Sequence, residues 1–475
     1  MQTNLYIDGN WVPSQSAQRF DVMNPATEDV IASVASADIF DADLALNAAS
    51  IAMQEWAARS PRDRSEVLRK AWELMTARLP EFARLITLEN GKANADAMGE
   101  ANYAAEFFRW FAEEAVRVDG LISHAPASGA RIIVQHKPAG IAVLVTPWNY
   151  PAAMGTRKIA PALAAGCAVI IKPASETPLT MLALMPLLEE AGVPKGVVNV
   201  LPSRNTGVLV DHMLHDPRVR VVSFTGSTEV GRKLLHSAAD QILKPAMELG
   251  GNAPAIVFED ANLDVAVEGV MLAKMRNLGE ACTAANRIYV HSSIAPAFTE
   301  KFTSAMAALK IGNGLEAGID VGPLVNSDTR NKVDAFVQDA VAKGAKVELG
   351  GVLPTGKGFF YPPTVLSGVP ETADCVGDEI FGPVAALQVF NDQEDVIRRA
   401  NDTEYGLVAY VFSEDMKRAL QVCERLDYGM VGLNRGLVSD PAAPFGGTKQ
   451  SGLGREGGHE GMHEFMETQY ISASW

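Results

Sequence analysis

The sequence is poor in the residue patterns that hold metal ions or disulfide frameworks. It has four cysteines among 475 residues, and no two of them form a CxxC pair. Its eight histidines include no HExxH motif. Structural metal sites and disulfide-rich folds need closely spaced ligands or cysteines, so neither class fits. We expect no metal site, and the scattered cysteines favour a reducing cytoplasm.

Positive charge and long apolar runs are also scarce. The 41 lysines and arginines are outnumbered by 57 acids, which gives a formal net charge of -16. Nucleic acids and anionic membranes bind basic faces, so we expect neither as a partner. No stretch reaches the ~18 apolar residues of a membrane span, and the polar start Met1-Gln2-Thr3-Asn4 does not resemble a signal peptide. What remains is a globular enzyme with room for two or three domains.

Two α/β patterns follow a mainly helical first part. Residues 4–12 read as a hairpin turning at Asp8-Gly9, and residues 41–59 and 61–90 have helical spacing. From Gly140 apolar strands alternate with helices. The strands are expected at 141–145, 168–171, 197–201 and 219–224. This alternation predicts an α/β fold with a doubly wound parallel sheet, which binds ligands beyond the carboxyl ends of its strands. A second α/β pattern begins after Glu248.

Several residues at these strand ends and turns have chemistry to offer. Cys282 is either a buried core cysteine or a nucleophile at a helix start, where the dipole would lower the thiol pKa. Glu248, before Gly250-Gly251, is either a turn acid facing water or a general base. Asn149 fits a helix N-cap before Pro151 and also an oxyanion donor. Lys172 is either a surface lysine or a ligand for ribose or phosphate oxygens. The turn at Gly226-Ser227 opens a helix whose N–H groups suit a phosphate, although no GxGxxG fingerprint is present.

Taken together, six motifs resemble the aldehyde dehydrogenase superfamily. They are Pro147-Trp148-Asn149, Lys172-Pro173-Ala174-Ser175, Phe224-Thr225-Gly226-Ser227, Glu248-Leu249-Gly250-Gly251, the Cys282 segment and Glu379-Ile380-Phe381-Gly382-Pro383. They occur in the family's order, and the likeness runs from about Leu5 to the C-terminus.

The resemblance implies a role for each matching residue. Cys282 would attack the aldehyde to form a thiohemiacetal, Asn149 and the Cys282 N–H would hold its oxyanion, and Glu248 would activate the hydrolytic water. Lys172 and Glu379 would hold the cofactor riboses. The cofactor cleft would also be lined by Trp148, Ser227, Leu249 and Phe381, with Gly226 in its turn. The chemistry is consistent, because an aldehyde has no leaving group except hydride and needs a covalent adduct.

Within the superfamily the chain is most similar to succinate-semialdehyde dehydrogenases. In that subfamily two arginines and a serine, matching Arg157, Arg276 and Ser439, bind the distal carboxylate of the substrate. Arginine suits this role because it makes paired, charge-assisted hydrogen bonds to carboxylates. The alternative is that both arginines form structural ion pairs. A general or glutarate-semialdehyde-type dehydrogenase with the same mechanism, and a non-catalytic relative, stay open as further alternatives.

The cofactor is predicted to be NADP, with NAD possible. Many NAD-using relatives carry glutamate where this chain has Ser175, and a carboxylate there would repel a 2'-phosphate. The neighbouring Glu176 would undo part of this preference if its side chain turned inward. Two further departures concern the nucleophile. Glu280 stands where relatives often have glutamine, and it would raise the thiol pKa if it faced Cys282. Ala284 replaces the second cysteine of a redox-switch disulfide found in some relatives.

The family likeness also implies a domain plan. We expect a cofactor-binding domain from residues 1–116 and 137–247, a catalytic domain at 248–445, and a β-strand oligomerisation arm from 117–136 and 462–475. The arm is expected to bridge subunits in a homodimer or homotetramer.

Overall fold

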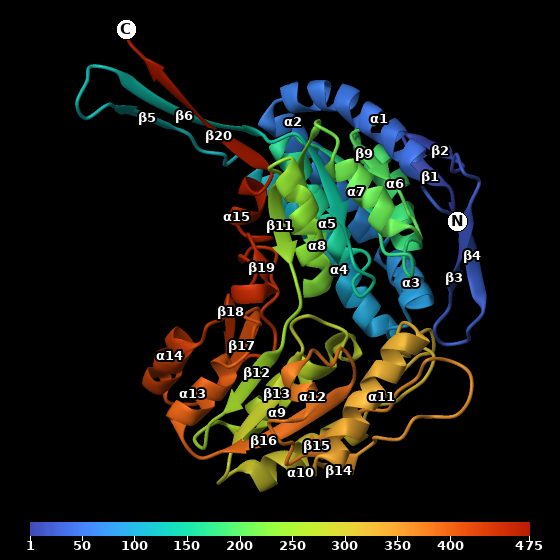
Figure 1. Cartoon of the computed structure of the whole chain (residues 1–475), viewed down its shortest axis with the longest axis vertical. Helices are drawn as coiled ribbons and strands as arrows, with labels where there is room; N and C mark the ends of the chain where they lie inside the picture. The colour runs from blue at the N-terminus through green and yellow to red at the C-terminus, as the bar shows by residue number, and fades with distance from the viewer.

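Two large sheets organise the chain. The computed structural model describes residues 1–475, and Figure 1 shows the two sheets one above the other, with a strand arm projecting from the upper one. The first sheet has eight strands, in the order β19 (Gly452–Leu453), β11 (Lys244–Glu248), β10 (Val219–Thr225), β7 (Ile141–Val145), β8 (Ala168–Lys172), β9 (Val198–Val200), β1 (Leu5–Ile7) and β2 (Asn10–Val12). Its five central strands are parallel, and antiparallel strands close both edges.

The second sheet has seven strands and carries the later part of the chain. Their order is β14 (Lys346–Leu349), β15 (Thr364–Ser367), β16 (Val384–Phe390), β13 (Ala285–His291), β12 (Ala253–Val257), β17 (Val408–Phe412) and β18 (Met430–Leu433). All neighbours pair in parallel except β14 with β15. The predicted α/β class is therefore confirmed.

Helices bury both faces of each sheet, as the near-continuous apolar strands require. Along β7, Ile141, Val143 and Val145 belong to one core cluster, and Ala142 and Leu144 belong to the other. The first face packs on α1 (Ile39–Ala58), α7 (Thr206–Leu214) and α8 (Thr228–Asp240). The second face packs on α2 (Pro61–Ala77), α3 (Leu79–Asn90), α4 (Asn94–Glu114), α5 (Ala153–Ala165) and α6 (Leu179–Ala191).

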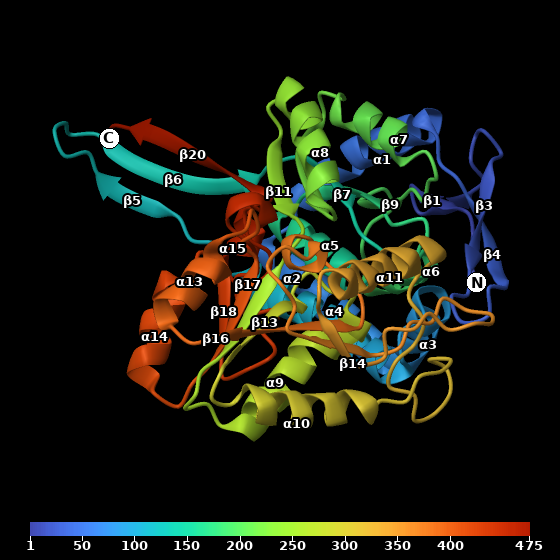
Figure 2. The ribbon, with the colours of Figure 1, turned by 60° about the horizontal axis from the view of Figure 1, so that its bottom comes forward.

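The second sheet is covered in the same way, and Figure 2 shows its helices on either side of the strands. The helices of this part are α9 (Leu263–Met275), α10 (Ala295–Ala307), α11 (Ser327–Ala342), α12 (Asp374–Gly377), α13 (Gln393–Asn401) and α14 (Met416–Arg425), with a 3-10 turn at Arg276–Gly279. The chain then returns to the first sheet, through a 3-10 turn (Lys449–Ser451), strand β19 and helix α15 (Glu460–His463), which packs on α5.

Two local predictions can be compared with the backbone. The first hairpin turns at Asp8 and Gly9, both with positive φ (51° and 69°), the conformation that tight hairpins of this kind require. The single helix expected over 61–90 is wrong, because the chain breaks at Arg78 into α2 and α3. Pro80 explains the break, since proline has no N–H to donate into a continuing helix and is favoured in a first turn.

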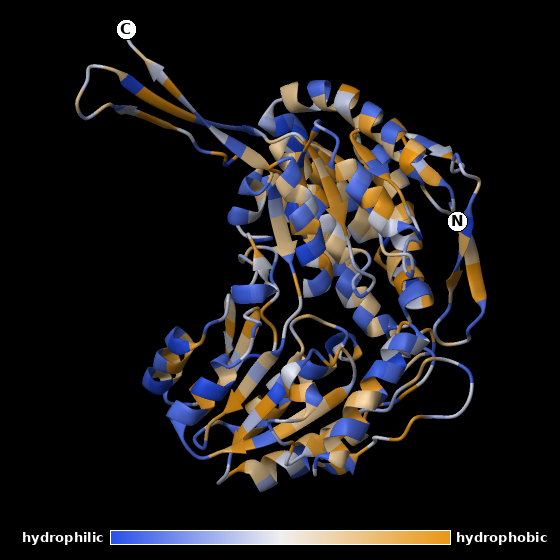
Figure 3. Cartoon of the chain, in the orientation of Figure 1, coloured by the Kyte–Doolittle hydropathy of each residue, from blue (hydrophilic) through white to orange (hydrophobic).

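A three-stranded arm extends away from the first sheet. It consists of β20 (Met466–Ala473), β6 (Arg131–Pro138) and β5 (Leu121–His124), all antiparallel, so the C-terminal strand does have a partner. Apolar side chains on it are exposed, among them Ile122 and Tyr470, and Figure 3 shows the apolar stretches along the arm. A separate hairpin, β3 (Arg19–Met23) with β4 (Val30–Ala35), lies on the opposite side of the molecule. None of the helices is both long and apolar enough to cross a membrane.

Candidate active site

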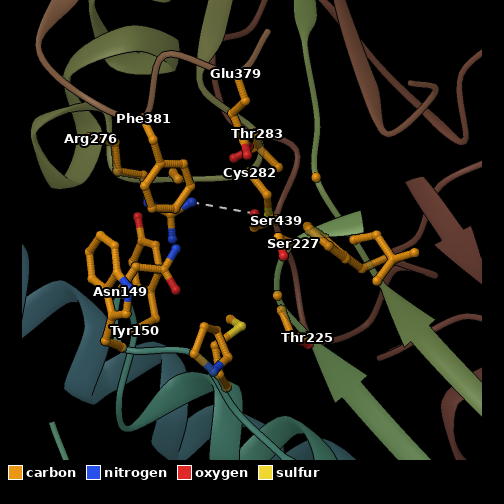
Figure 4. Close-up of a pocket in the computed structure, with 18 of the residues that line it drawn as sticks. Asn149, Tyr150, Thr225, Ser227, Arg276, Cys282, Thr283, Glu379, Phe381 and Ser439 are labelled. Atoms are coloured by element: carbon orange, nitrogen blue, oxygen red, sulfur yellow. Dashed lines mark hydrogen bonds between the residues drawn. The ribbon is translucent and has the colours of Figure 1, made fainter. Parts of the chain in front are cut away.

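A cavity of about 260 Å³ lies where the two sheets meet, and residues from both line it. Figure 4 shows Asn149 and Tyr150 from the segment after β7 on one side, and Cys282 and Thr283 on another. Most of the residues singled out in the sequence reach this cavity. They are Trp148, Asn149, Arg157, Gly226, Ser227, Leu249, Arg276, Cys282, Glu379, Phe381 and Ser439. Lys172 and Ser175 line an adjoining groove, and Glu248 lies buried at the end of β11.

The segment before Cys282 has an unusual backbone. Asn277, Leu278 and Gly279 follow one another with positive φ (52°, 44° and 82°), a region that costs a non-glycine residue free energy. Gly251 packs against this segment at the carbonyl of Cys282. A Cβ on Gly251 would lie 2.3 Å from the carbonyl oxygen of Cys282, so only glycine fits there. The turn after Glu248 and the cysteine segment are thus in direct backbone contact.

The thiol of Cys282 is not activated in the way the sequence suggested. Cys282 lies in a loop that runs into strand β13, so no helix dipole points at it. Burial, followed by the carboxyls of Glu379 and Glu248, raises the pKa of the Cys282 thiol to about 12, against a smaller opposing effect of Arg157. The expected lowering is therefore wrong. The thiol has to transfer its proton during attack on the substrate.

Glu280 does not face the thiol. Its side chain is fully buried and Oε1 accepts from the backbone N–H of Val325 (3.2 Å). Oε2 is buried without a partner, and burial raises the pKa of this carboxyl well above its usual value. A neutral, protonated Glu280 is what this environment favours. It does not contribute to the raised thiol pKa of Cys282.

Asn149 is placed by the loop rather than by a helix cap. Helix α5 has its N-cap at Ala152, without a side-chain cap, so the N-cap alternative is wrong. Instead the Asn149 amide donates from Nδ2 to the carbonyl of Glu280 (3.0 Å). The backbone carbonyl of Asn149 accepts from Lys92 Nζ (2.6 Å) and from Asn277 Nδ2 (3.0 Å). These bonds fix Asn149 beside Cys282 and leave it one amide hydrogen for an oxyanion.

Glu248 is a buried acid, not a turn acid facing water. It is 3% exposed, and neither carboxylate oxygen has a hydrogen-bond partner. Burial, then the charge of Glu456, raises its pKa well above the usual value, and Arg157 and Lys158 oppose that shift. A carboxyl with a raised pKa is suited to accepting a proton near neutral pH.

The two arginines differ in how they are held. Arg157 is buried, its Nε lies 2.6 Å from Glu456 Oε2, and its guanidinium lies 4.2 Å from the ring centre of Phe445. Its Nη2 has no partner. Arg276 forms no ion pair and donates from Nη1 to the hydroxyl of Ser439 (3.3 Å), the bond drawn in Figure 4. Arg157 therefore combines a structural ion pair with a free donor, and Arg276 is available to a ligand.

Several of the residues expected to hold the cofactor line an adjoining groove. It shares Pro147, Trp148, Gly226 and Ser227 with the cavity, so the two are continuous. Lys172 lies at its base without an ion pair, and burial lowers the pKa of its ammonium to about 8, still mostly protonated at neutral pH. At the cavity end, Glu379 Oε1 accepts from the Gly251 N–H (3.2 Å).

Other residues expected at the cofactor lie in the groove or in the cavity. Trp148 lines both and Phe381 lines the cavity, and their rings lie edge to face with centroids 5.3 Å apart. Ser227 is the N-cap of α8, with its hydroxyl accepting from the Val230 N–H. The Ser175 hydroxyl donates to Glu176 (3.2 Å), so this acid does line the groove.

Sequence reasoning missed some of the residues around the site. Lys92 and Glu100 form a fully buried ion pair (2.5 Å), and Glu100 accepts from the backbone at the start of α5. Tyr103 lines the cavity from α4. Lys92 lies in the loop between α3 and α4, and Glu100 and Tyr103 lie in α4. All three are far from every motif in the sequence, and nothing in the local pattern distinguishes them from their neighbours. Tyr150, next to Asn149 in the chain, also lines the cavity.

Comparisons with known proteins agree with this geometry. The model of the aldehyde dehydrogenase family matches residues 11–471. A succinate-semialdehyde dehydrogenase of Paenarthrobacter nicotinovorans is 53% identical over 442 residues, 93% of this chain and 98% of the relative. A glutarate-semialdehyde dehydrogenase of Pseudomonas putida is 48% identical, over 99% of this chain and 97% of the relative. The crystal structure of an NADP-dependent enzyme of E. coli superposes with a TM-score of 0.98 at 44% identity, over 100% of this chain and 98% of the other.

The chain therefore belongs to the aldehyde dehydrogenase family. It is an NAD(P)-dependent oxidoreductase of that class.

Proposed function

We propose that the protein oxidises succinate semialdehyde to succinate. The observation that carries the proposal is the position of Arg276, bonded to Ser439 and free of any acidic partner, in the same cavity as Cys282. A half-buried arginine without an ion pair calls for an anionic partner, and a distal carboxylate supplies one. The relative from Paenarthrobacter nicotinovorans bears the name of this activity.

The residues of the chain divide the reaction into two stages. Cys282 attacks the aldehyde carbon and loses its proton, and the resulting thiohemiacetal oxygen is held by the Asn149 amide and the Cys282 N–H. When bound, NAD(P) supplies the acceptor for the hydride that leaves this carbon. Glu248 then takes a proton from the water that hydrolyses the thioester and releases the carboxylate product. The net change is aldehyde plus water plus oxidised cofactor to carboxylate plus reduced cofactor plus two protons.

For the cofactor we propose NADP as the preferred form, with NAD also used. Ser175 places a hydroxyl instead of a carboxylate beside Lys172, which favours a 2'-phosphate. Glu176 works against this, because it lines the groove and accepts from Ser175. Its negative charge limits the preference to a moderate one. An E. coli structure with the same fold is described as NADP-dependent, in line with the proposal.

A glutarate-semialdehyde activity is the second candidate, because a relative of that name is 48% identical over nearly the whole chain. The two substrates differ by one methylene group, so the distance from Cys282 to the arginine pair decides between them. A methylene is worth about 10–200-fold in discrimination by an enzyme pocket.

The test is the initial rate of reduced cofactor formation with succinate semialdehyde, glutarate semialdehyde and butanal, each with NADP and NAD. We expect the carboxylated aldehydes to be strongly preferred, and Arg276→Ala to abolish that preference while leaving butanal turnover intact. Equal use of butanal and succinate semialdehyde by the wild-type protein would contradict the proposed substrate. No turnover of any aldehyde would favour the non-catalytic alternative.

We further propose that the arm (β5, β6 and β20) bridges subunits of a homodimer or homotetramer. The domain plan proposed with it has a cofactor-binding domain (1–116 and 137–247), a catalytic domain (248–445) and the arm (117–136 and 462–475). The support is its exposed apolar side chains, including Ile122 (72% exposed) and Trp475 (78% exposed), on strands that project from the first sheet. Sedimentation of the full chain and of a variant with Ile122→Lys measures the state directly.

A further inference from the structure

Two tyrosine hydroxyls at the cavity have no partner in the protein. Tyr103 projects from α4 and Tyr150 follows Asn149 in the segment after β7, and both line the cavity that holds Cys282. The hydroxyl oxygen of each is buried, and neither meets hydrogen-bond geometry with another residue, although the Ser439 hydroxyl lies close enough to Tyr103 to lower its pKa. Tyr150 is only 7% exposed as a whole. A buried hydroxyl normally finds a partner, so two such groups at one wall of a binding cavity point to a ligand.

The same two rings surround Arg276. The guanidinium carbon of Arg276 lies 5.3 Å from the ring centre of Tyr150 and 5.8 Å from that of Tyr103, distances at which a cation is attracted to an aromatic ring. Arg276, Ser439, Tyr103 and Tyr150 also line a second hollow that adjoins the cavity. The arginine is thus held between the tyrosines, at the end of the cavity where the hollow begins.

The electrostatic environment of the hydroxyls favours an anionic acceptor. Burial raises the pKa of Tyr103, and Arg157, Arg276 and the neighbouring Ser439 partly oppose the rise. Burial also raises the pKa of Tyr150; Arg276 opposes the rise, and Asp96 and Glu100 add to it. Both phenols are therefore protonated donors at neutral pH, and Arg276 is the cation that acts on both. Donors of this kind bind a carboxylate more strongly than any neutral group.

Tyr410, another tyrosine near the site, is already engaged. The Tyr410 hydroxyl donates to the carbonyl of Thr283 (2.8 Å), so it only supports the segment around the nucleophile. The ring of Tyr150, in contrast, is held in place by Lys92 as well as by Arg276, because Lys92 Nζ lies 4.1 Å from the ring centre. Its hydroxyl thus stays in place without a hydrogen bond of its own, which is the condition for a preorganised donor.

We propose that Tyr103 and Tyr150 are specificity-determining residues that donate hydrogen bonds to the distal carboxylate of the substrate, together with Arg157, Arg276 and Ser439. The inference rests on the proposed function and deepens it. A carboxylate offers about four lone-pair positions, enough to accept from several of these donors at once. The tyrosines add selectivity against uncharged aldehydes, because such substrates leave the buried hydroxyls unpaired when they enter.

If the tyrosines have this role, removing a hydroxyl should affect the carboxylated and the uncharged substrate differently. Removing a hydroxyl takes a donor from the carboxylated substrate but removes a desolvation penalty for the uncharged one. For Tyr103→Phe, Tyr150→Phe and the double variant, we expect kcat/KM for succinate semialdehyde to fall about tenfold or more per hydroxyl. For butanal, which has the same chain length, we expect kcat/KM to stay unchanged or rise. The loss should lie mainly in KM, because the distal group is bound before and during the chemical step.

A matched control is Tyr361→Phe. Tyr361 does not line the cavity. It is buried in a core cluster with residues of α11, and its hydroxyl donates to Asp334 (3.1 Å). This variant loses a buried tyrosine hydroxyl and should lower Tm without changing the ratio of the two substrates. An equal fall of both substrates in the Tyr103 and Tyr150 variants would show that the hydroxyls are structural and would overturn the inference, as would an unchanged ratio.

The outcomes separate the inference from the proposed function. If the wild-type protein does not prefer succinate semialdehyde to butanal, the proposed function fails, whatever the variants do. If the wild-type preference is present and survives both tyrosine substitutions, only the inference fails. Binding of the product succinate to the wild-type and variant proteins, measured by calorimetry with cofactor present, gives an independent readout. Weaker succinate binding in both variants, and not in Tyr361→Phe, is the expected result.

Discussion

Replacing Gly251 with alanine tests how closely the fold positions the nucleophile. The new Cβ would lie 2.3 Å from the carbonyl oxygen of Cys282, and real Cβ contacts stay above 3.0 Å. The backbone of Cys282 must therefore move by at least 3.0 - 2.3 = 0.7 Å relative to residue 251. A displacement of about 1 Å at a reacting centre costs up to 10²-fold in rate, and forced overpacking destabilises by about 1–3 kcal/mol.

The assay is steady-state kinetics with the best aldehyde, together with thermal unfolding of the same samples. We expect Gly251→Ala to lower kcat by one to two orders of magnitude, about what a 1 Å shift implies, and to lower Tm by a few degrees. Gly377→Ala is the matched control, because an added Cβ there meets nothing within 4 Å. A Gly251→Ala protein with wild-type kcat would refute the argument that this contact sets the position of the thiol.

Three further expectations concern protonation and cofactor choice. Because the pKa of the Cys282 thiol is raised to about 12 and that of Glu248 is also raised, kcat/KM should increase from pH 6 to pH 9; a flat profile would contradict both shifts. Glu280 has a raised folded-state pKa, so its stabilising contribution is present below its unfolded pKa and is lost as pH rises. The unfolding free energy of Glu280→Gln should therefore rise relative to that of the wild type between pH 5 and pH 9, by up to about 1.4 kcal/mol per pH unit, and its Tm should rise relative to the wild-type Tm. A constant difference would show that Glu280 is ionised when folded. Finally, Ser175→Glu should lower the NADP to NAD ratio of kcat/KM and Glu176→Gln should raise it; opposite changes would place the 2'-phosphate elsewhere.

Much of the fold could be predicted because the strands are regular. The apolar runs at 141–145 and 168–171 coincide with β7 and β8 within a residue, since strands buried on both faces need apolar side chains at every position. The break at Arg78 was missed, because helical spacing continues across it and only Pro80 marks it. The predicted positions of Lys172 at a strand end and Asn149 after β7 place both residues at the ligand-binding edge of the sheet.

The electrostatics of the site could not be read from the sequence. Cys282 was expected to have a lowered pKa from a helix start, and burial beside acids raises it instead. Glu280 was considered as a neighbour of the thiol, but its side chain turns toward Val325. Both outcomes depend on what packs around these side chains, in a segment whose left-handed backbone at 277–279 no local propensity predicts for Asn277 and Leu278 together.

The sequence by itself determined the α/β class, the strands of the first sheet and the set of reactive residue types, because hydrophobic periodicity and strand-end position are local properties. Only the tertiary structure decided which side chains meet. In the folded chain Arg276 donates a hydrogen bond to Ser439, 163 residues away in the sequence. Tyr103, from the distant helix α4, packs against Arg276 and lines the same cavity. The tertiary structure also set the charge states of Cys282 and Glu248, since desolvation depends on everything packed around a group and not on its neighbours in the chain.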